Sequence, residues 1–347
     1  MDKANDIQHG ANAFRWAPPK RRSAVVPVFL PFHGCPTRCL FCAQHSQTGV
    51  KDVSLKNILP KFKMLLEERA AKHEDAPELA FYGGTFTAMP IGEQKLCLDF
   101  AAGLKERGLV SSFRCSTRPD CVDRAALARL KAAGCATLEL GVQSFDDVAL
   151  RACRRGYGGR EALAACARVK EAGFALGVQL LPGLPGSSPE DFVNDVQIAL
   201  SAAGADMLRF YPCLVLRGTE LEAAWRDGKY MPMPLDICLE TLADGWLKAL
   251  KAGVPVIRMG LAPEKSLEAA IAAGPHHPAL GTRVMARALY RAVESAARGG
   301  KLRSLQVPQN CRGYFWGHRG ELRPAWAALG LTPDAVNFVQ GETVSLC

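Results

Sequence analysis

The chain has 347 residues, of which 48% are hydrophobic and 22% charged, with a formal net charge of +9. This composition excludes a wholly disordered chain and is enough for one large domain, or a large and a small one. The polar first sixteen residues lack the apolar core of a signal peptide, and later apolar stretches are too short to span a membrane, so we expect a cytoplasmic protein with no membrane partner.

Thirteen cysteines, an odd number, are mostly scattered singly through segments with helix or strand patterns. This distribution favours a reducing compartment over a disulfide framework. The basic residues are spread along the chain and interleaved with acidic ones, so the net charge alone leaves contact with nucleic acid open.

From Ala24 onward, short apolar runs alternate with longer helical patterns, which is typical of repeated βα units on a parallel sheet. Strands are predicted at 24–30, 78–82, 112–116, 137–141, 175–181 and 206–211. Helices are predicted between them at 55–72, 92–106, 123–133, 159–172 and 189–202. Six units of this kind predict a partial or complete barrel whose strand ends meet at one rim. The run 254–259 fits either a seventh strand or the start of the C-terminal part.

The pattern divides the chain into an N-terminal extension (1–23), an α/β core (24–260) and a mostly helical C-terminal extension or lid (261–347). Helices are predicted in the last region at 264–273 and 280–298. We expect Lys20-Arg21-Arg22 to be a solvated lead-in to the first strand.

Two motifs of the C-terminal region have simple structural explanations. His276-His277 lies between prolines, which indicates a turn rather than a metal site. Tyr314-Phe315-Trp316 precedes His318 and Arg319, and these aromatic side chains either stack on a base or ring, or pack a small C-terminal core.

Three cysteines, Cys35, Cys39 and Cys42, lie within eight residues directly after the first predicted strand. Thiolates are the usual ligands of iron-sulfur clusters, and a 4Fe-4S cluster normally takes four, so this run leaves one iron open to another ligand. A zinc site with His33 or His45 as the fourth ligand is an alternative, although structural zinc typically uses two separated cysteine pairs. Three ordinary buried cysteines in one loop have no packing reason.

Unusual residues follow the other predicted strands as well. They are Gly83-Gly84-Thr85, Thr117-Arg118-Pro119, Gln143-Ser144, Pro182-Gly183 and Pro212-Cys213. Glu139 lies inside an apolar strand, where a carboxylate needs a hydroxyl or cation as partner. Arg118 could pair with a ligand carboxylate or form a structural ion pair. Tyr211 and Cys213 lie near the rim, where they either face substrate or are buried.

The cysteine run, with Phe41 before its last cysteine, resembles the signature of the radical S-adenosylmethionine (SAM) superfamily. The resemblance implies a partial (β/α)6 TIM-like barrel, a 4Fe-4S cluster on Cys35, Cys39 and Cys42, and SAM bound at the open iron. It also implies an electron donor such as flavodoxin or ferredoxin. Cleavage of SAM then yields methionine and a 5'-deoxyadenosyl radical that abstracts hydrogen from a substrate.

The resemblance further implies which residues surround SAM, while no catalytic residue is assigned. These are Phe41, Gly83, Gly84, Thr85, Ser116, Arg118, Glu139, Gln143 and Leu181. In the glycine motif, only glycine leaves room for backbone to approach the methionyl amino group. The family similarity implies that Glu139 binds the ribose hydroxyls, and the turn that includes Leu181 presents backbone groups to adenine or is only a rigid turn.

Longer strings at 138–147, 180–187 and 209–221 resemble the radical SAM part of the Elongator catalytic subunit and its short bacterial relatives. They are also similar to oxygen-independent coproporphyrinogen oxidases. The match covers about 25–259. We expect no acetyltransferase domain after Leu261, do not recognise the C-terminal domain of the coproporphyrinogen enzyme, and expect no second cluster, since Cys115 and Cys121 are the nearest remaining pair.

Three hypotheses follow from the sequence. The first is a radical SAM enzyme whose substrate is RNA, with transfer RNA modification as the expected role. The second is the same chemistry on a small molecule such as a tetrapyrrole or another metabolite. The third is a non-catalytic iron-sulfur or zinc protein that acts as a sensor or scaffold.

Overall fold

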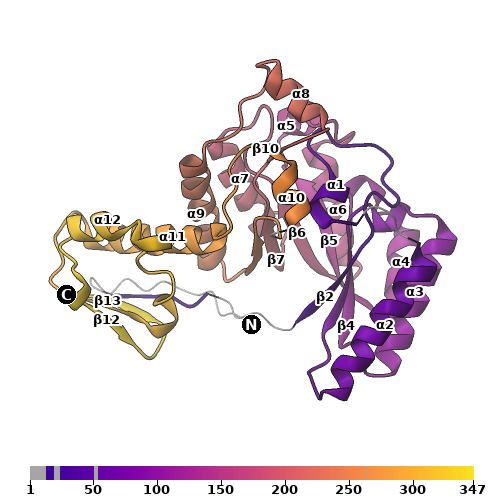
Figure 1. The fold of residues 1–347 in the computed structure, drawn as a ribbon, viewed down its shortest axis with the longest axis horizontal. Coiled ribbons are helices and arrows are strands. Elements are labelled where there is room, and N and C mark those ends of the chain that lie inside the picture. Colours follow the sequence, from indigo (N-terminus) through magenta and orange to yellow (C-terminus); the bar gives the residue numbers. More distant parts are fainter. Residues whose placement is uncertain (1–12, 19–23, 51–53, 263) are drawn as a thin grey trace.

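A computed structural model describes residues 13–18, 24–50, 54–262 and 264–347. Its central element is a parallel sheet of seven strands in the order β2-β3-β4-β5-β6-β7-β9, curled into an open half-barrel (Figure 1). The strands are β2 (Val25–Phe29), β3 (Glu78–Tyr82), β4 (Ser112–Thr117), β5 (Cys135–Gln143), β6 (Ala175–Leu180), β7 (Met207–Phe210) and β9 (Val256–Met259). Because sequential strands are neighbours and all are parallel, the loops after them meet at one rim.

Helices connect the strands and cover the outer face of the half-barrel (Figure 1). The longer ones are α2 (Leu55–Ala71), α3 (Ile91–Glu106), α4 (Arg124–Ala132), α6 (Gly159–Glu171), α7 (Pro189–Leu200) and α9 (Leu235–Lys251). Shorter ones are α1 (Gln44–Thr48), α5 (Asp147–Ala152), α8 (Glu220–Arg226) and α10 (Lys265–Ala270). Short 3₁₀ turns lie at Phe86–Ala88, Pro119–Cys121, Gln309–Cys311, His318–Gly320 and Pro333–Ala335. None of the helices in the described ranges is long and apolar enough to cross a membrane.

Local sequence explains where these helices begin. The Asp123 carboxylate accepts from the Ala126 backbone at the start of α4. At the start of α7, the N-cap residue Ser188 and the third helical residue Asp191 form a reciprocal capping box, with Pro189 at the first helical position. Each cap satisfies backbone N–H groups that the first turn leaves without partners.

The predicted α/β half-barrel is confirmed, with every predicted strand and inter-strand helix present. The run 254–259 is a seventh strand, since β9 pairs in parallel with β7. The predicted helix at 264–273 is shorter than expected. Its last three residues form β10 (Ile271–Ala273), which pairs with β8 (Val215–Leu216).

The C-terminal region contains the predicted helix α11 (Leu280–Ala297), then α12 (Arg323–Ala328) and a small sheet that the sequence did not predict. Its strands lie in the order β1 (Ala13–Arg15), β13 (Thr343–Leu346), β11 (Leu305–Pro308) and β12 (Val336–Val339). β1 pairs antiparallel with β13, so part of the N-terminal extension belongs to this sheet. Lys20-Arg21-Arg22 lies outside the described residues.

Ion pairs join the C-terminal region to the core along α9 and α11, which lie side by side (Figure 1). Arg287 of α11 pairs with Asp236 and Glu240, and Arg291 with Asp244. Arginines four residues apart on one helix therefore meet carboxylates four residues apart on the other. All thirteen cysteines of the chain are free thiols.

Candidate functional site

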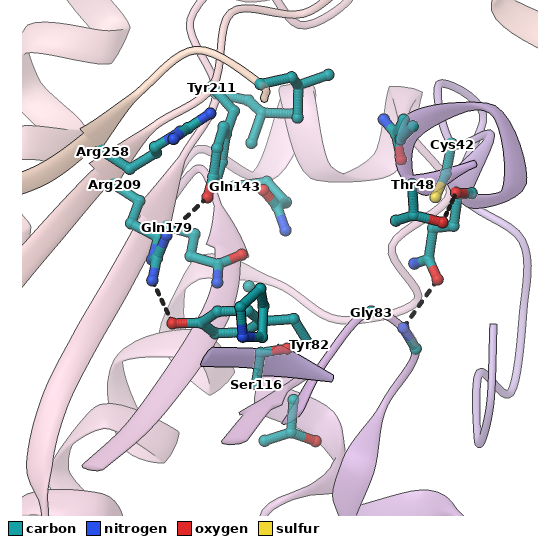
Figure 2. Close-up of a pocket in the computed structure, with 18 of the residues that line it drawn as sticks. Cys42, Thr48, Tyr82, Gly83, Ser116, Gln143, Gln179, Arg209, Tyr211 and Arg258 are labelled. Carbon is teal, nitrogen blue, oxygen red and sulfur yellow. Dashed lines mark hydrogen bonds between the residues drawn. The ribbon is translucent and has the colours of Figure 1, made fainter. Parts of the chain in front are cut away.

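A cavity of about 1220 Å³ lies inside the half-barrel, at the rim where the strands end (Figure 2). The predicted site residues that line it are Cys35, Cys39, Cys42, Phe41, Gly83, Gly84, Thr85, Ser116, Arg118, Gln143 and Leu181. Glu139 is the one predicted residue that does not line it. The structure therefore brings together side chains from five strand ends that the sequence placed at one rim.

The cysteine loop contributes three partly exposed thiols to this cavity. Burial, and then repulsion from Cys39 and Cys35, raises the pKa of Cys42 to about 12, and burial also raises the pKa of Cys35. No three His, Cys, Asp or Glu side chains in the described part of the chain converge closely enough to hold a metal ion. Binding a cluster would therefore require the loop to draw its three sulfurs together.

Two arginines lie directly beside Cys39. Nη1 of Arg155 donates to Sγ of Cys39 at 2.8 Å, and Nη1 of Arg118 lies 3.8 Å from the same sulfur. Arg118 also pairs with Asp120 at 2.8 Å, which agrees with its interpretation as a structural ion pair. A thiolate needs cations or backbone dipoles nearby, so this donor set fits an iron-sulfur cluster.

The sequence did not single out Arg155, although its side chain is almost completely buried. Its guanidinium donates to the Gly141 carbonyl at 2.6 Å and to the Tyr157 hydroxyl at 2.9 Å. The only signal was the pair Arg154-Arg155 after α5, and a sequence does not show which of two adjacent arginines turns inward.

The glycine motif has a packing role in the structure. Gly84 has φ +61°, and a Cβ there would collide with the backbone of His33. Its N–H donates to Oε1 of Gln44 at 2.8 Å, and the same oxygen accepts from the Phe32 N–H at 2.5 Å. Glycine is therefore needed here because the cysteine loop lies directly on this backbone.

Glu139 is fully buried and is bound by protein cations rather than exposed to the cavity. Its carboxylate pairs with Arg209 at 2.6 Å and Arg114 at 3.0 Å, and accepts from Tyr82 at 2.9 Å and Gln179 at 3.1 Å. Burial alone would raise the pKa of Glu139, but the two arginines outweigh it and hold that pKa below its usual value. The expected cation partner is present, and the ribose contact implied by resemblance stays a prediction.

Gln143 is the predicted residue with the least ordinary conformation. Its φ is +72°, at a register irregularity near the end of β5. The side chain points into the cavity (Figure 2), and its buried Oε1 has no hydrogen-bond partner in the described residues. A strained backbone that presents an unpaired acceptor to a cavity is suited to receive a ligand hydroxyl or amino group.

The remaining motifs lie as follows. Phe41 and Leu181 belong to one apolar cluster that closes the cavity beside the cysteine loop. Tyr211 lines the cavity, whereas Cys213 is buried at its wall. His277 contacts the ring of His318 at 4.8 Å, in the C-terminal region and outside the cavity.

The aromatic run at 314–316 packs mainly inside the C-terminal region. Phe315 stacks on Trp326 with ring centroids 4.3 Å apart, and the hydroxyl of Tyr314 accepts from Nε1 of Trp16 at 2.8 Å. Trp316 is half-buried, with the Arg323 guanidinium 5.2 Å from its ring. These contacts favour a small core over base stacking for Tyr314 and Phe315.

Comparison with known families agrees with this geometry. Residues 29–199 match the radical SAM superfamily, and residues 205–290 match the C-terminal domain found in radical SAM proteins. The chain belongs to the radical SAM superfamily of enzymes. Its members use a 4Fe-4S cluster and SAM, which the cysteine loop and cavity suit.

Named relatives narrow the resemblance further. The tRNA uridine(34) acetyltransferase of Methanocaldococcus infernus is 29% identical over an alignment of 264 positions, and the match covers 63% of this chain and 48% of that protein. Elongator complex protein 3 of Drosophila melanogaster is 27% identical, over 63% of this chain and 48% of that protein. The chain thus matches about half the length of these relatives.

A solved structure shows the same fold. It is Elp3 of Methanocaldococcus infernus with an N-terminal deletion, with a TM-score of 0.58 and 23% sequence identity. The similarity covers 81% of this chain and 66% of that structure. The structural match shows a shared fold, and the named relatives confirm the predicted likeness to the Elongator group.

Proposed function

We propose that the protein is a cytoplasmic enzyme that cleaves SAM reductively and uses the resulting radical to modify RNA. The observation that carries the proposal is the cysteine loop, whose three thiols open into one cavity with the predicted SAM-binding residues. When bound, the cluster supplies the electron that splits SAM into methionine and a 5'-deoxyadenosyl radical. The proposed electron donor is a protein such as flavodoxin or ferredoxin.

In this proposal the residues of the chain hold the cluster, orient the cofactor and bind the substrate. Cys35, Cys39 and Cys42 would ligate three irons, and Arg155 would offset their negative charge. Gln143 would offer its unpaired Oε1 to the cofactor inside the cavity. Residues 24–260 would form the catalytic core and 261–347 a substrate-binding extension.

RNA is supported as the substrate by charge and by the relatives' names. Residues 298–323 include six exposed Lys and Arg side chains and a single acidic residue, Glu321, which pairs with Arg283. Such a surplus of positive charge favours binding to a phosphate backbone. The relatives named above act on tRNA uridine or belong to Elongator, which makes tRNA the first substrate to test.

An anaerobic assay tests the SAM chemistry. The cluster is reconstituted, SAM and dithionite are added, and 5'-deoxyadenosine is quantified by chromatography. Cys39→Ala should abolish the product, and Cys121→Ala, a partly exposed cysteine outside the predicted ligand set, should not. Equal product from wild type and Cys39→Ala would contradict the proposal.

Filter retention of tRNA at increasing salt tests the substrate. We expect retention to fall steeply between about 50 and 200 mM salt. Retention that is absent at low salt would favour the small-molecule alternative, for which metabolite changes in a deletion strain, with RNA nucleosides unchanged, are the corresponding evidence.

A further inference from the structure

The cavity has a second end, formed by β6, β7 and β9 and opposite the cysteine loop. Figure 2 shows Arg209, Tyr211 and Arg258 at this end, with Cys42 and Gly83 across the cavity. Arg209 and Arg258 are register partners on the neighbouring strands β7 and β9. One wall of the cavity therefore carries two guanidinium groups.

The two arginines differ in how their charge is balanced. Arg209 pairs with Glu139 at 2.6 Å, and Arg114, deeper in the barrel, pairs with Glu78 and Glu139. The guanidinium of Arg258 donates from Nε to the Gly260 carbonyl at 3.0 Å. No carboxylate of the described residues lies within 4.0 Å of it, so Arg258 contributes a surplus positive charge.

A half-buried cation without a carboxylate partner, as Arg258 is, is unfavourable until an anion binds it. A guanidinium matches the two-oxygen edge of a phosphate and binds it with charge-assisted hydrogen bonds. The Tyr211 hydroxyl, which accepts from Arg209 at 3.1 Å, keeps its own proton to donate. In Figure 2 the Tyr211 hydroxyl points toward Arg209, and Arg258 lies beside the Tyr211 side chain at the same wall.

We propose that Arg258 binds a phosphate group of the substrate and so orients the substrate toward the cysteine loop. The inference rests on the proposed function, because it concerns the substrate of the same cavity. Arg155 and Arg258 lie at different ends, one against Cys39 and the other on β9. Their charges therefore serve the cofactor end and the substrate end separately.

Calorimetry on the anaerobic holoenzyme with SAM tests this inference without turnover. The probes are inorganic pyrophosphate, uridine 5'-monophosphate, uridine and an anticodon stem-loop RNA. We expect the monophosphate to bind about tenfold or more tightly than uridine, as one charge-assisted bidentate contact would give. Arg258→Gln should remove that preference, and Arg258→Lys should keep part of it.

Arg107→Gln is the matched control, since Arg107 is a surface residue after α3 that pairs with Glu67. Equal binding of uridine and its monophosphate to wild type would overturn the proposal, even if Arg258→Gln fails to fold. An unchanged preference in a folded Arg258→Gln protein would overturn it too.

The different probes also distinguish the two possible sources of the phosphate, RNA and a small substrate. Loss of both pyrophosphate and RNA binding in Arg258→Gln assigns the phosphate to RNA. Loss of pyrophosphate binding alone supports the anion site and assigns it to a small substrate, which would count against RNA as the proposed substrate. Absence of 5'-deoxyadenosine in the separate assay would count against the proposed chemistry without affecting this binding result.

Discussion

Arg155 donates a hydrogen bond to Cys39 across 116 residues of sequence, with 2.8 Å between Nη1 and Sγ. The other guanidinium nitrogens are fixed by the Gly141 carbonyl and the Tyr157 hydroxyl. The cation is therefore held in place by the barrel before any ligand arrives. This fixed cation would offset the negative charge of a Cys39 thiolate bound to iron.

Replacing Arg155 should weaken the cluster without removing a ligand. Arg155→Gln is expected to retain iron about tenfold or more poorly during titration with a chelator, because partners of metal ligands typically contribute that much affinity. Arg154→Gln is the matched control, since Arg154 is exposed and pairs with Glu220 on the surface. Equal iron retention in the two variants would show that Arg155 has no such role.

Gly84 should tolerate no side chain. Gly84→Ala adds a collision with the His33 backbone to the strain of a positive φ, so we expect a loss of more than about 2 kcal/mol in the free energy of unfolding. Gly108→Ala is the control, because Gly108 has φ +69° and open space around it, which isolates the strain. Urea unfolding measures both, and a Gly84→Ala loss no larger than that of Gly108→Ala would refute the packing role.

Glu139 should matter for stability as well as for the site. Glu139→Gln leaves the buried cations Arg114 and Arg209 without much of their compensation, which typically costs about 3–5 kcal/mol. Glu67→Gln, which breaks the exposed pair with Arg107, should leave urea unfolding unchanged. A small effect of Glu139→Gln would mean that the arginines find other partners.

Asp195 on α7 predicts a pH dependence. Burial raises the pKa of Asp195 to about 6, although its carboxylate accepts from the Phe145 N–H at 2.7 Å. The folded state then binds this proton more tightly than the unfolded state, so the contribution of Asp195 to stability falls as pH rises from about 4 to 6. This pKa shift corresponds to a change of about 3 kcal/mol in the contribution of Asp195 to the free energy of unfolding.

Asp195→Asn should remove that dependence, because the amide oxygen can still accept from the Phe145 N–H. The free energy of unfolding of the variant, measured with urea and compared with that of wild type, should rise by up to about 3 kcal/mol from pH 4 to pH 7. A stability difference that is the same at both pH values would show that the pKa of Asp195 is not raised.

The barrel was predictable because its strands are apolar runs followed at once by unusual residues. The small C-terminal sheet was not, because its strands have three or four residues and Ala13–Arg15 pairs with a segment more than 320 residues away. A period-2 pattern cannot be recognised over so few residues. β10, three residues long, was absorbed into a predicted helix for the same reason.

In the candidate site too, residues that stand in a recognisable sequence motif could be predicted, and residues whose role depends on their neighbours in space could not. The cysteines, Gly84 and Gln143 were found because each stands at a strand end with a visible motif. Arg155 and Arg258 were not, because their importance depends on which charges lie nearby in space. The sequence showed that the Glu139 carboxylate needs a partner, but only the structure shows that Arg114 and Arg209 are its cation partners.

The most direct test of the central claim is electron paramagnetic resonance of the reconstituted, dithionite-reduced protein, with and without SAM. We predict a reduced 4Fe-4S signal that SAM changes, because three cysteines leave one iron open to it. In Cys39→Ala the signal should be lost. Zinc in place of iron, or an iron-sulfur signal that SAM leaves unchanged, would contradict the account.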